Sequence, residues 1–582
     1  GNRAPDNKGG AGYDQTRADF DFDRGSNAAA TRINSSGLIE KYRENVLLQS
    51  NQFDTTWTRT KVAATSGQAD PNGGSTAWKI TESTNDTATY CYLGQSVTAN
   101  TISFYAKAGE MTEVLIYVGV SRGIYFDLTD GSFVGYYSAN TDMIYNSTSV
   151  GGGWYRYSVF YIGMVTAEIY PAVSGDLYHD LVIGNGFYLW RAQAETGLVA
   201  TDYLNSTTTT GKAGVLIDLP RINYDANGEN GALLLEPSRQ QLIQFSEYFG
   251  DSYWTKSGAS VVGGFTSPEG LSNAYKLVED TSTGDKNIFT SSISITNSTS
   301  YSIHHYIKAG EKEIVGIQDV INSQYWASID LINGVVLDEK TSGSTKVEPL
   351  INGYYKVSYP FISNTTSIRP SIFLLPDSYT TGRPSDQDYT GDGTSGVYIF
   401  GAMLEAGSYS TSYIPNHGTS GGVTRAADSC SVTGASDVIG QTEGTLFVDF
   451  EIDADNTNGF NRVLAVGDGT SANRIIILAQ NTGVFRFYVT NSGTNQVDII
   501  TTTSILGGRH KAAFGYKEND FVAYVDGVQV ASDTSGSVPA CPNFYLGMNE
   551  EGSAQNLEGQ IKQATLFKER LTNAELATLT TL

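Results

Sequence analysis

The chain has 582 residues, 17% of them charged, and a formal net charge of −24. At about 150 residues per domain this length predicts three to four domains, each large enough to bury a core. A surface of this sign repels polyanions, which argues against nucleic-acid binding. The sequence has no run of about 18 apolar residues, so no membrane insertion is expected.

Composition favours an all-β chain. Aromatic residues make up 11%, with 36 tyrosines and 63 glycines, and Ser, Thr and Asn are abundant. Such a composition is typical of short strands joined by turns. The chain has three cysteines, Cys91, Cys430 and Cys541, and so small and odd a number does not form a disulfide framework. We expect inert thiols, with a Cys430–Cys541 bond as the alternative.

The N-terminal region, residues 1–44, is expected to be an attachment arm followed by a connector. Residues 1–20 are polar and have nothing to bury, which predicts a flexible or partner-ordered arm. Residues 19–40 fit an extended connector. Residues 1–30 lack the apolar core of a signal peptide, and what precedes Gly1 is left open.

A whole domain is duplicated. Residues 186–204 read GFYLWRAQAETGLVATDYL and residues 396–414 read GVYIFGAMLEAGSYSTSYI, with Gly, Tyr, Ala, Glu, Gly, Thr and Tyr at identical offsets. Further matches keep the same order along the chain. Within each copy, alternating apolar runs are separated by Asp-Gly and Asn-Gly turns. We therefore predict two β-sandwiches in series, at residues 45–205 and 240–415.

Two joins and a different third domain complete the chain. The join 206–239 carries apolar triplets, so we expect it to pack against a sandwich and not to hang free. The linker 416–440 is richer in Gly, Ser and Thr. Residues 441–582 show new alternating strands and one C-terminal helix, which Thr572 and Glu575 begin as a capping box.

These stretches resemble a known group of proteins. ATRINSSGLIE at residues 30–40 and PRINYDANGENGALLLEPSRQQLI at 220–243 look like a connector found in structural proteins of tailed bacteriophages. The stretch at 396–415 resembles the closing strands of jelly-roll modules similar to carbohydrate-binding modules. Residues 509–530 and 561–576 resemble laminin-G or concanavalin-like sandwiches. The resemblance implies two tandem jelly-roll β-sandwiches followed by a concanavalin-like β-sandwich, in a virion protein.

Candidate ligand-binding residues are aromatic. Tyr325 and Trp326 are the predicted ligand contacts, because Trp326 aligns with Gly123 of the first copy and is therefore not required by the fold. Trp57, Trp254 and the other tryptophans at shared aromatic positions are expected in the core.

No catalytic or metal-binding residues are predicted, and no cofactor. The five histidines are scattered over different domains: His179, His304, His305, His417 and His510. Glu195 and Glu405 recur, but a glycosidase needs two facing carboxylates, so each is expected to anchor backbone amides where the last strand turns. Residues 386–393 resemble the start of a calcium loop without its closing glutamate, which favours turn chemistry.

The expected function is a non-enzymatic virion protein, a fibre, appendage or surface decoration on the particle. Its expected partners are other virion proteins, through the N-terminal arm, and a host cell-surface glycan bound multivalently. The family implies a homo-oligomer, often a trimer. The alternatives left open are a decoration without host binding, a polysaccharide depolymerase and a secreted bacterial adhesin.

Overall fold

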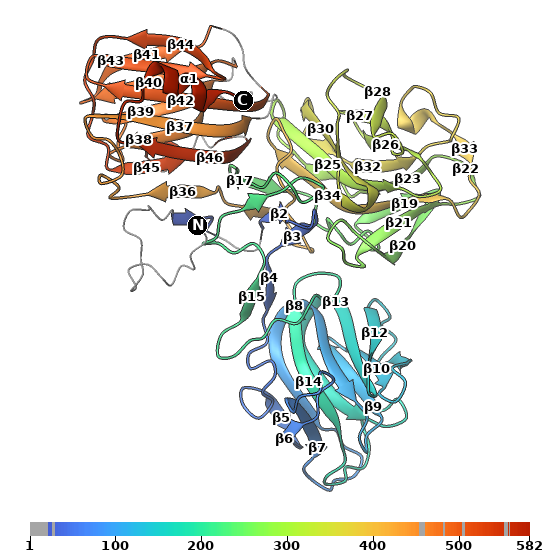
Figure 1. Ribbon diagram of the computed structural model, residues 1–582. Coiled ribbons are helices and arrows are strands. Elements are labelled where there is room, and N and C mark those ends of the chain that lie inside the picture. The colour runs from blue at the N-terminus through green and yellow to red at the C-terminus, as the bar shows by residue number, and fades with distance from the viewer. Residues whose placement is uncertain are drawn as a thin grey trace.

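The computed structural model describes residues 21–25, 29–452, 460–480, 483–502, 507–551, 557 and 559–582. The predicted attachment arm, residues 1–20, lies outside the described residues. The described part forms three β-sandwiches, which confirms the predicted all-β class (Figure 1). Helix α1 (Asn573–Thr580) begins at the predicted Thr572 capping box, and no helix of the described ranges is long and apolar enough to cross a membrane.

The first jelly roll is built around two long strands, β8 (Tyr92–Lys107) and β13 (Trp154–Ala172), which pair with each other and run through both of its layers. The other strands pair with these two or extend the sheet from them. They are β5 (Thr58–Thr60), β6 (Val62–Gln68), β7 (Ala77–Glu82), β9 (Glu113–Gly119), β10 (Arg122–Asp127), β11 (Phe133–Tyr136), β12 (Ile144–Gly151) and β14 (Gly186–Glu195).

The second jelly roll consists of two six-stranded sheets. One sheet contains, in spatial order, β19 (Trp254–Ser257), β23 (Lys286–Thr290), β32 (Pro370–Leu374), β26 (Ile314–Asp319), β27 (Trp326–Asp330) and β28 (Val335–Glu339). The other contains β20 (Ala259–Phe265), β21 (Ala274–Glu279), β34 (Gly396–Ala406), β25 (Ser300–Ala309), β30 (Tyr354–Ile362) and β29 (Lys346–Pro349). Trp57 and Trp254, the matched tryptophans of the two copies, are both buried in their cores, as predicted.

The C-terminal sandwich has two seven-stranded sheets. One is β1 (Asp21–Asp23), β36 (Ser429–Val432), β45 (Asn543–Leu546), β38 (Phe460–Gly467), β39 (Arg474–Gln480), β40 (Phe485–Asn491) and β41 (Thr494–Ile500). The other is β16 (Ile222–Asn223), β17 (Ala232–Leu235), β46 (Gly559–Phe567), β37 (Glu443–Ile452), β42 (Gly508–Lys517), β43 (Asp520–Val525) and β44 (Val528–Asp533). Cys430 and Cys541 are buried free thiols in its core, and Cys91 is one in the first jelly roll.

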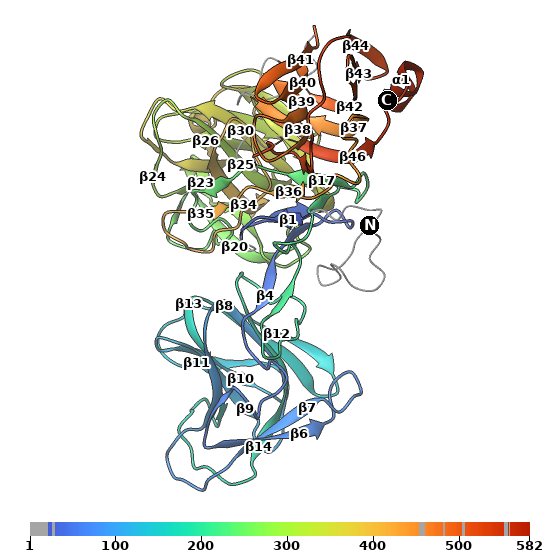
Figure 2. The same cartoon turned by 90° about the vertical axis from the view of Figure 1, so that its left-hand side faces the viewer.

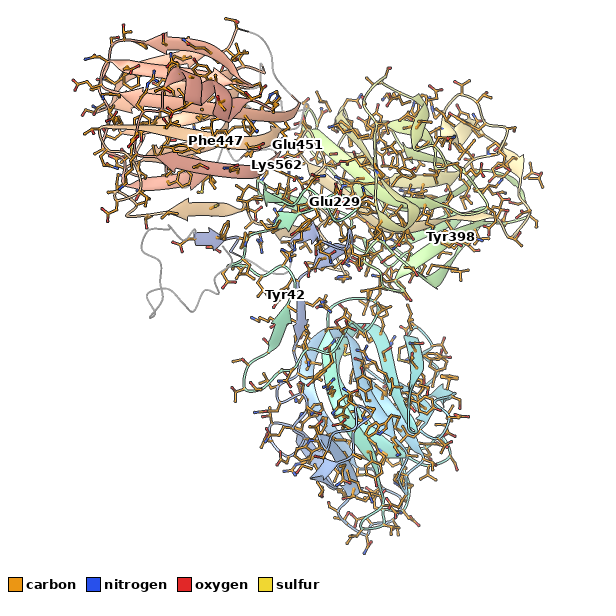
Figure 3. All side chains as sticks on the ribbon, viewed as in Figure 1. Tyr42, Glu229, Tyr398, Phe447, Glu451 and Lys562 are labelled. Atoms are coloured by element: carbon orange, nitrogen blue, oxygen red, sulfur yellow. The ribbon has the colours of Figure 1, made fainter. Side chains whose placement is uncertain are left out.

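Strands from distant parts of the chain complete this sandwich. β1 pairs with β36, and β17, from the join between the jelly rolls, pairs with β46 through Leu233 and Ile561. The prediction that the join packs against a sandwich is therefore confirmed. Lys562 and Glu451 of the sandwich pair at 3.7 Å, and both are labelled in Figure 3 together with Glu229 of the join.

The first jelly roll projects from the other two bodies. The chain enters it through β4 (Arg43–Asn45) and leaves it through β15 (Gly211–Ala213), and these two strands pair as a ribbon. Figures 1 and 2 show this ribbon between the first jelly roll and the two upper bodies, and Figure 3 places Tyr42 at the end of the ribbon nearer the two upper bodies. A ring contact between Phe160 and Tyr248, at 5.3 Å, also joins the two jelly rolls. The domain is thus an insertion on a two-stranded stem.

Buried ion pairs hold the connector, the second jelly roll and the C-terminal sandwich together. Arg221 contacts Glu236 at 2.8 Å and also pairs with Asp428, and Arg425 contacts the same Glu236 oxygen at 2.8 Å. Ser412 donates its backbone N–H to Glu236 at 2.7 Å. Against the effect of burial, Arg425 and Arg221 hold the pKa of Glu236 well below its usual range. We call these four charged residues the junction network.

A second buried charge cluster lies beside the stem. Lys41, at the end of β3 (Ile39–Lys41), pairs with both Glu247 and Glu269 of the second jelly roll. Two buried carboxylates thus share one ammonium group. Burial and the nearby charge of Glu247 raise the pKa of Glu269 to about 7. Despite its burial, Glu247 has a lowered pKa because of Lys41.

This cluster predicts a pH dependence that Glu269→Gln should remove. The pKa of Glu269 is about 4.5 in the unfolded chain and about 7 in the folded chain, so protonation of this carboxyl group favours folding. This contribution to the free energy of unfolding is fully present below pH 4.5 and is lost as the pH rises through about 7. The neutral Glu269→Gln variant should therefore gain stability over the native chain at pH 8 and lose that gain at pH 5. Urea unfolding at both values measures this. Glu311→Gln, which changes an exposed partner of Lys276, is the control; equal pH profiles for Glu269→Gln and the native chain would contradict the assignment.

Candidate ligand-binding face on the first jelly roll

Six tyrosines gather on the outer face of the first jelly roll, over β8, β13 and β9. Strand alternation points Leu93, Ile116 and Ile169 into the core, so their neighbours Tyr92, Tyr117 and Tyr170 point outward. Loops next to these strands add the other three. We define the tyrosine face as Tyr90, Tyr92, Tyr117, Tyr137, Tyr170 and Tyr178.

The rings form one continuous aromatic surface. Tyr92 and Tyr170 stack with centroids 5.0 Å apart and planes at 26°, and Tyr90 meets Tyr178 edge to face at 5.7 Å. Tyr117 meets Tyr137 at 5.5 Å and Tyr170 at 6.1 Å. Tyr90 is 39% exposed and Tyr178 is 52% exposed. Rings held in this way offer apolar faces and hydroxyl groups to a ligand at little entropic cost.

The corresponding face of the second jelly roll is closed. The register places Gln318 and Phe373 where the first copy has Tyr117 and Tyr170. There the segment 375–395, longer than its counterpart 173–185, covers the sheet: the backbone N–H of Ser385 donates to Gln318 at 3.1 Å. Phe373 is only 1% exposed. In the first copy the face stays partly open: Tyr90 and Tyr178 are exposed, while Tyr117, Tyr137 and Tyr170 are half-buried against Leu115, Tyr125 and Leu177.

The two predicted ligand residues, Tyr325 and Trp326, lie in different surroundings: one is in the core and the other is on the outer face of the sheet. Tyr325 is fully buried, with its ring 5.3 Å from Phe361 in the core of the second jelly roll, so it presents no face to a ligand. Trp326 is half-buried at the start of β27, opposite Gln318. Its counterpart Gly123 lies opposite Tyr117. Trp326 thus lies on the closed equivalent of the tyrosine face, and its role in binding stays a prediction.

The tyrosine face was missed by sequence reasoning. Its residues come from strands and loops that are far apart in the chain, and each tyrosine alone is typical of a strand. The available signal was the loss of these tyrosines in the second copy, where Tyr117 is replaced by Gln318 and Tyr170 by Phe373.

The repeated glutamates anchor loops. Glu195 accepts hydrogen bonds from the backbone N–H of Thr201 at 2.9 Å and from its hydroxyl at 2.5 Å. Glu405 accepts the same two from Thr411, both at 2.7 Å. Burial raises the pKa of both carboxyl groups. The predicted anchoring role is confirmed, and it explains why Thr recurs six residues after each Glu.

Asp392, His179 and His510 have partners inside the protein, whereas the buried ring nitrogens of His304 and His305 have no hydrogen-bond partner among the described residues. Asp392 accepts from the backbone N–H groups of Thr394 and Ser395, both at 2.7 Å, which is turn chemistry. His179 bonds Glu82 at 2.6 Å, and His510 bonds Asp526 at 2.7 Å. Within the described ranges, no three His, Cys, Asp or Glu side chains are grouped so that they could hold a metal ion.

A cavity of about 540 Å³ lies where the connector, the second jelly roll and the C-terminal sandwich meet. Its charged lining residues already have partners inside the protein. Arg32 bonds Glu40 at 2.7 Å, and Lys356 lies 3.4 Å from Glu348. Glu236 belongs to the junction network. We therefore interpret this cavity as a space left where the connector, the second jelly roll and the C-terminal sandwich pack together, and not as a ligand site.

The architecture defines an all-β protein of three sandwiches, the last of concanavalin-like type. A family model described as the concanavalin A-like lectin/glucanases superfamily matches residues 427–577, which is the C-terminal sandwich. No curated protein matches the chain.

Three solved structures illustrate the structural similarity. The CBM40 of Ruminococcus gnavus IT-sialidase is 17% identical with a TM-score of 0.22, over 25% of this chain and 86% of that one. The NanB sialidase of Streptococcus pneumoniae is 18% identical with a TM-score of 0.23, over 26% of each chain. A SAP-like pentraxin from Limulus polyphemus is 12% identical with a TM-score of 0.20, over 23% of this chain and 68% of that one. Similarities at this level do not identify a ligand.

Proposed function

We propose that this protein is a non-enzymatic structural component of a tailed-bacteriophage virion, a fibre, appendage or surface decoration, that binds host cell-surface glycans. The tyrosine face carries the binding part of the proposal. Sugar rings present apolar C–H faces that pack on aromatic rings, while their hydroxyl groups bond to polar groups at the rim. The lectin-type family model on residues 427–577 and the phage-like connector support the same interpretation.

The architecture suits a binding module held away from a particle. The first jelly roll, which bears the tyrosine face, sits on the stem of β4 and β15. In the proposed assembly several copies act together through a homo-oligomer such as a trimer, attached by the N-terminal arm, so weak single contacts add up to firm adsorption.

The test uses the full chain with two matched double variants. Tyr90→Ala with Tyr178→Ala removes the two most exposed rings of the face. Phe133→Ala with Tyr145→Ala removes an exposed stacked pair elsewhere on the same jelly roll, at 4.7 Å, and is the control. Losing an aromatic hot spot of about 2 kcal/mol weakens binding roughly 30-fold. We expect that loss for the first variant only, measured as binding of labelled protein to susceptible cells.

Competition with phage adsorption separates the alternatives. The native chain should block adsorption, and the double variant at Tyr90 and Tyr178 should not. A folded native chain that neither binds cells nor blocks adsorption would favour an architectural decoration. Release of oligosaccharides from host polysaccharide would instead favour a depolymerase, and equal binding by both variants would refute the tyrosine face as the contact.

A further inference from the structure

We infer that the tyrosine face selects uncharged saccharides over acidic ones, and that Glu168 is the residue that determines this specificity. The inference rests on the proposed glycan binding, and it names the class of ligand that the face accepts.

Glu168 lies on β13 within the tyrosine face. The register places it opposite Gly94 on β8 and Tyr117 on β9. A Cβ atom added at Gly94 would lie 2.5 Å from Cγ of Glu168, so the glycine makes room for this side chain. The carboxylate therefore lies on the sheet surface among the rings, where a bound sugar would meet it.

The carboxylate is oriented but can accept more hydrogen bonds. The Tyr170 hydroxyl donates to Oε2 at 2.6 Å, and the Thr166 hydroxyl donates to Oε1 at 2.9 Å. Each carboxylate oxygen has two acceptor sites, so both can also receive a sugar hydroxyl. Such charge-assisted bonds are strong, and they require a ligand that donates.

The rim of the face adds negative charge. Glu113 accepts a hydrogen bond from the backbone N–H of Gly175 at 2.7 Å. Burial raises the pKa of Tyr137, and the nearby Asp176 carboxylate adds to this rise. Of the cations at this edge, Lys61 is paired with Asp86 at 3.2 Å and His179 is bonded to Glu82 at 2.6 Å, whereas Arg59 is exposed on β5, next to β8.

A carboxylate on the ligand would therefore meet like charge on a half-buried surface. Such a juxtaposition is screened less than in open water and is strongly unfavourable. A neutral sugar avoids this repulsion and keeps the hydroxyl bonds to Glu168. The formal net charge of the whole chain, −24, also repels an acidic ligand at longer range.

The test compares pairs of oligosaccharides that are identical except for one sialic or uronic acid residue. Binding of the native full chain, Glu168→Gln and Glu110→Gln is measured by calorimetry at low salt. Glu110 pairs with Lys79 at 2.8 Å on a different part of the same jelly roll and serves as the control. We expect the native chain to prefer the neutral member at least tenfold, Glu168→Gln to reduce this ratio to threefold or less, and Glu110→Gln to leave it unchanged.

Other outcomes overturn the inference in distinguishable ways. Equal or tighter binding of the acidic member by the native chain would refute the selectivity. A ratio that Glu168→Gln leaves unchanged would refute the role of Glu168, provided that circular dichroism shows this variant folded; the smaller change Glu168→Asp, which keeps the charge, should retain the native ratio. A folded native chain that binds none of the saccharides would refute the proposed function itself.

Discussion

Replacing Arg221 by alanine is expected to destabilise the junction of the connector, the second jelly roll and the C-terminal sandwich by about 3–5 kcal/mol. Arg221 is fully buried and pairs with Glu236 and Asp428, whose side chains are 7% and 5% exposed. Its loss removes the guanidinium group that bridges the two carboxylates, and leaves Glu236 with Arg425, and Asp428 with Arg24 at 3.5 Å, as the remaining buried counter-charges. Hydrogen exchange of residues 221–236 and 412–432 at pH 7 measures the effect where it arises, since separate domains need not unfold together.

Arg32→Ala is the matched control for this prediction. Arg32 also belongs to the connector and also pairs with a glutamate, Glu40, but both side chains are 25% exposed. An exposed pair of this kind contributes about 0–1 kcal/mol. Similar protection in the Arg221 and Arg32 variants would show that the junction network does not hold the bodies together.

Replacing Gly186 by alanine is expected to destabilise the first jelly roll by about 3 kcal/mol. A Cβ atom at Gly186 would lie 2.0 Å from the carbonyl oxygen of Ile80 on the neighbouring strand β7. That carbonyl belongs to the sheet ladder and cannot move away without breaking it. Gly396 of the second copy has the same relation to Leu277, also at 2.0 Å, which explains why the repeated stretch opens with glycine.

Gly135→Ala provides the comparison within the same domain. Gly135 lies on β11, and a Cβ atom there would meet nothing within 4 Å. Its effect should stay within about 0.5 kcal/mol. Thermal unfolding followed by proteolysis of the first jelly roll reports both variants, and equal midpoints would mean that the close approach at Gly186 is relieved by backbone shifts.

Features that depend on local sequence were predictable. The tight turn at Asp526 and Gly527 is such a case: both residues have positive φ, 49° and 81°, as a two-residue hairpin with Asp-Gly requires. The capping box at Thr572 is another, since both of its bonds lie within one turn of helix. The glutamate anchors were predictable because each Glu and its Thr are six residues apart.

Features that depend on distant partners were not predictable. The apolar triplet of the join was expected to pack against a sandwich, but the choice of β46, more than 300 residues later, is set by which sheet edge is open. Trp326 was proposed from its alignment with Gly123, and the alignment holds in the strand register. The sheet face on which Trp326 lies is covered by segment 375–395 in the second copy, and the equivalent face of the first copy is partly exposed.

The sequence by itself determined the all-β class, the duplication, the turns and the anchored closing strands, because these follow from periodicity and from contacts a few residues apart. Only the tertiary structure decided where the connector strands pair, how Arg221, Glu236, Arg425 and Asp428 meet, and which jelly roll keeps an open tyrosine face. The reason is physical: sheet edges, buried ion pairs and surface rings are joined by packing between segments whose separation along the chain carries no local signal.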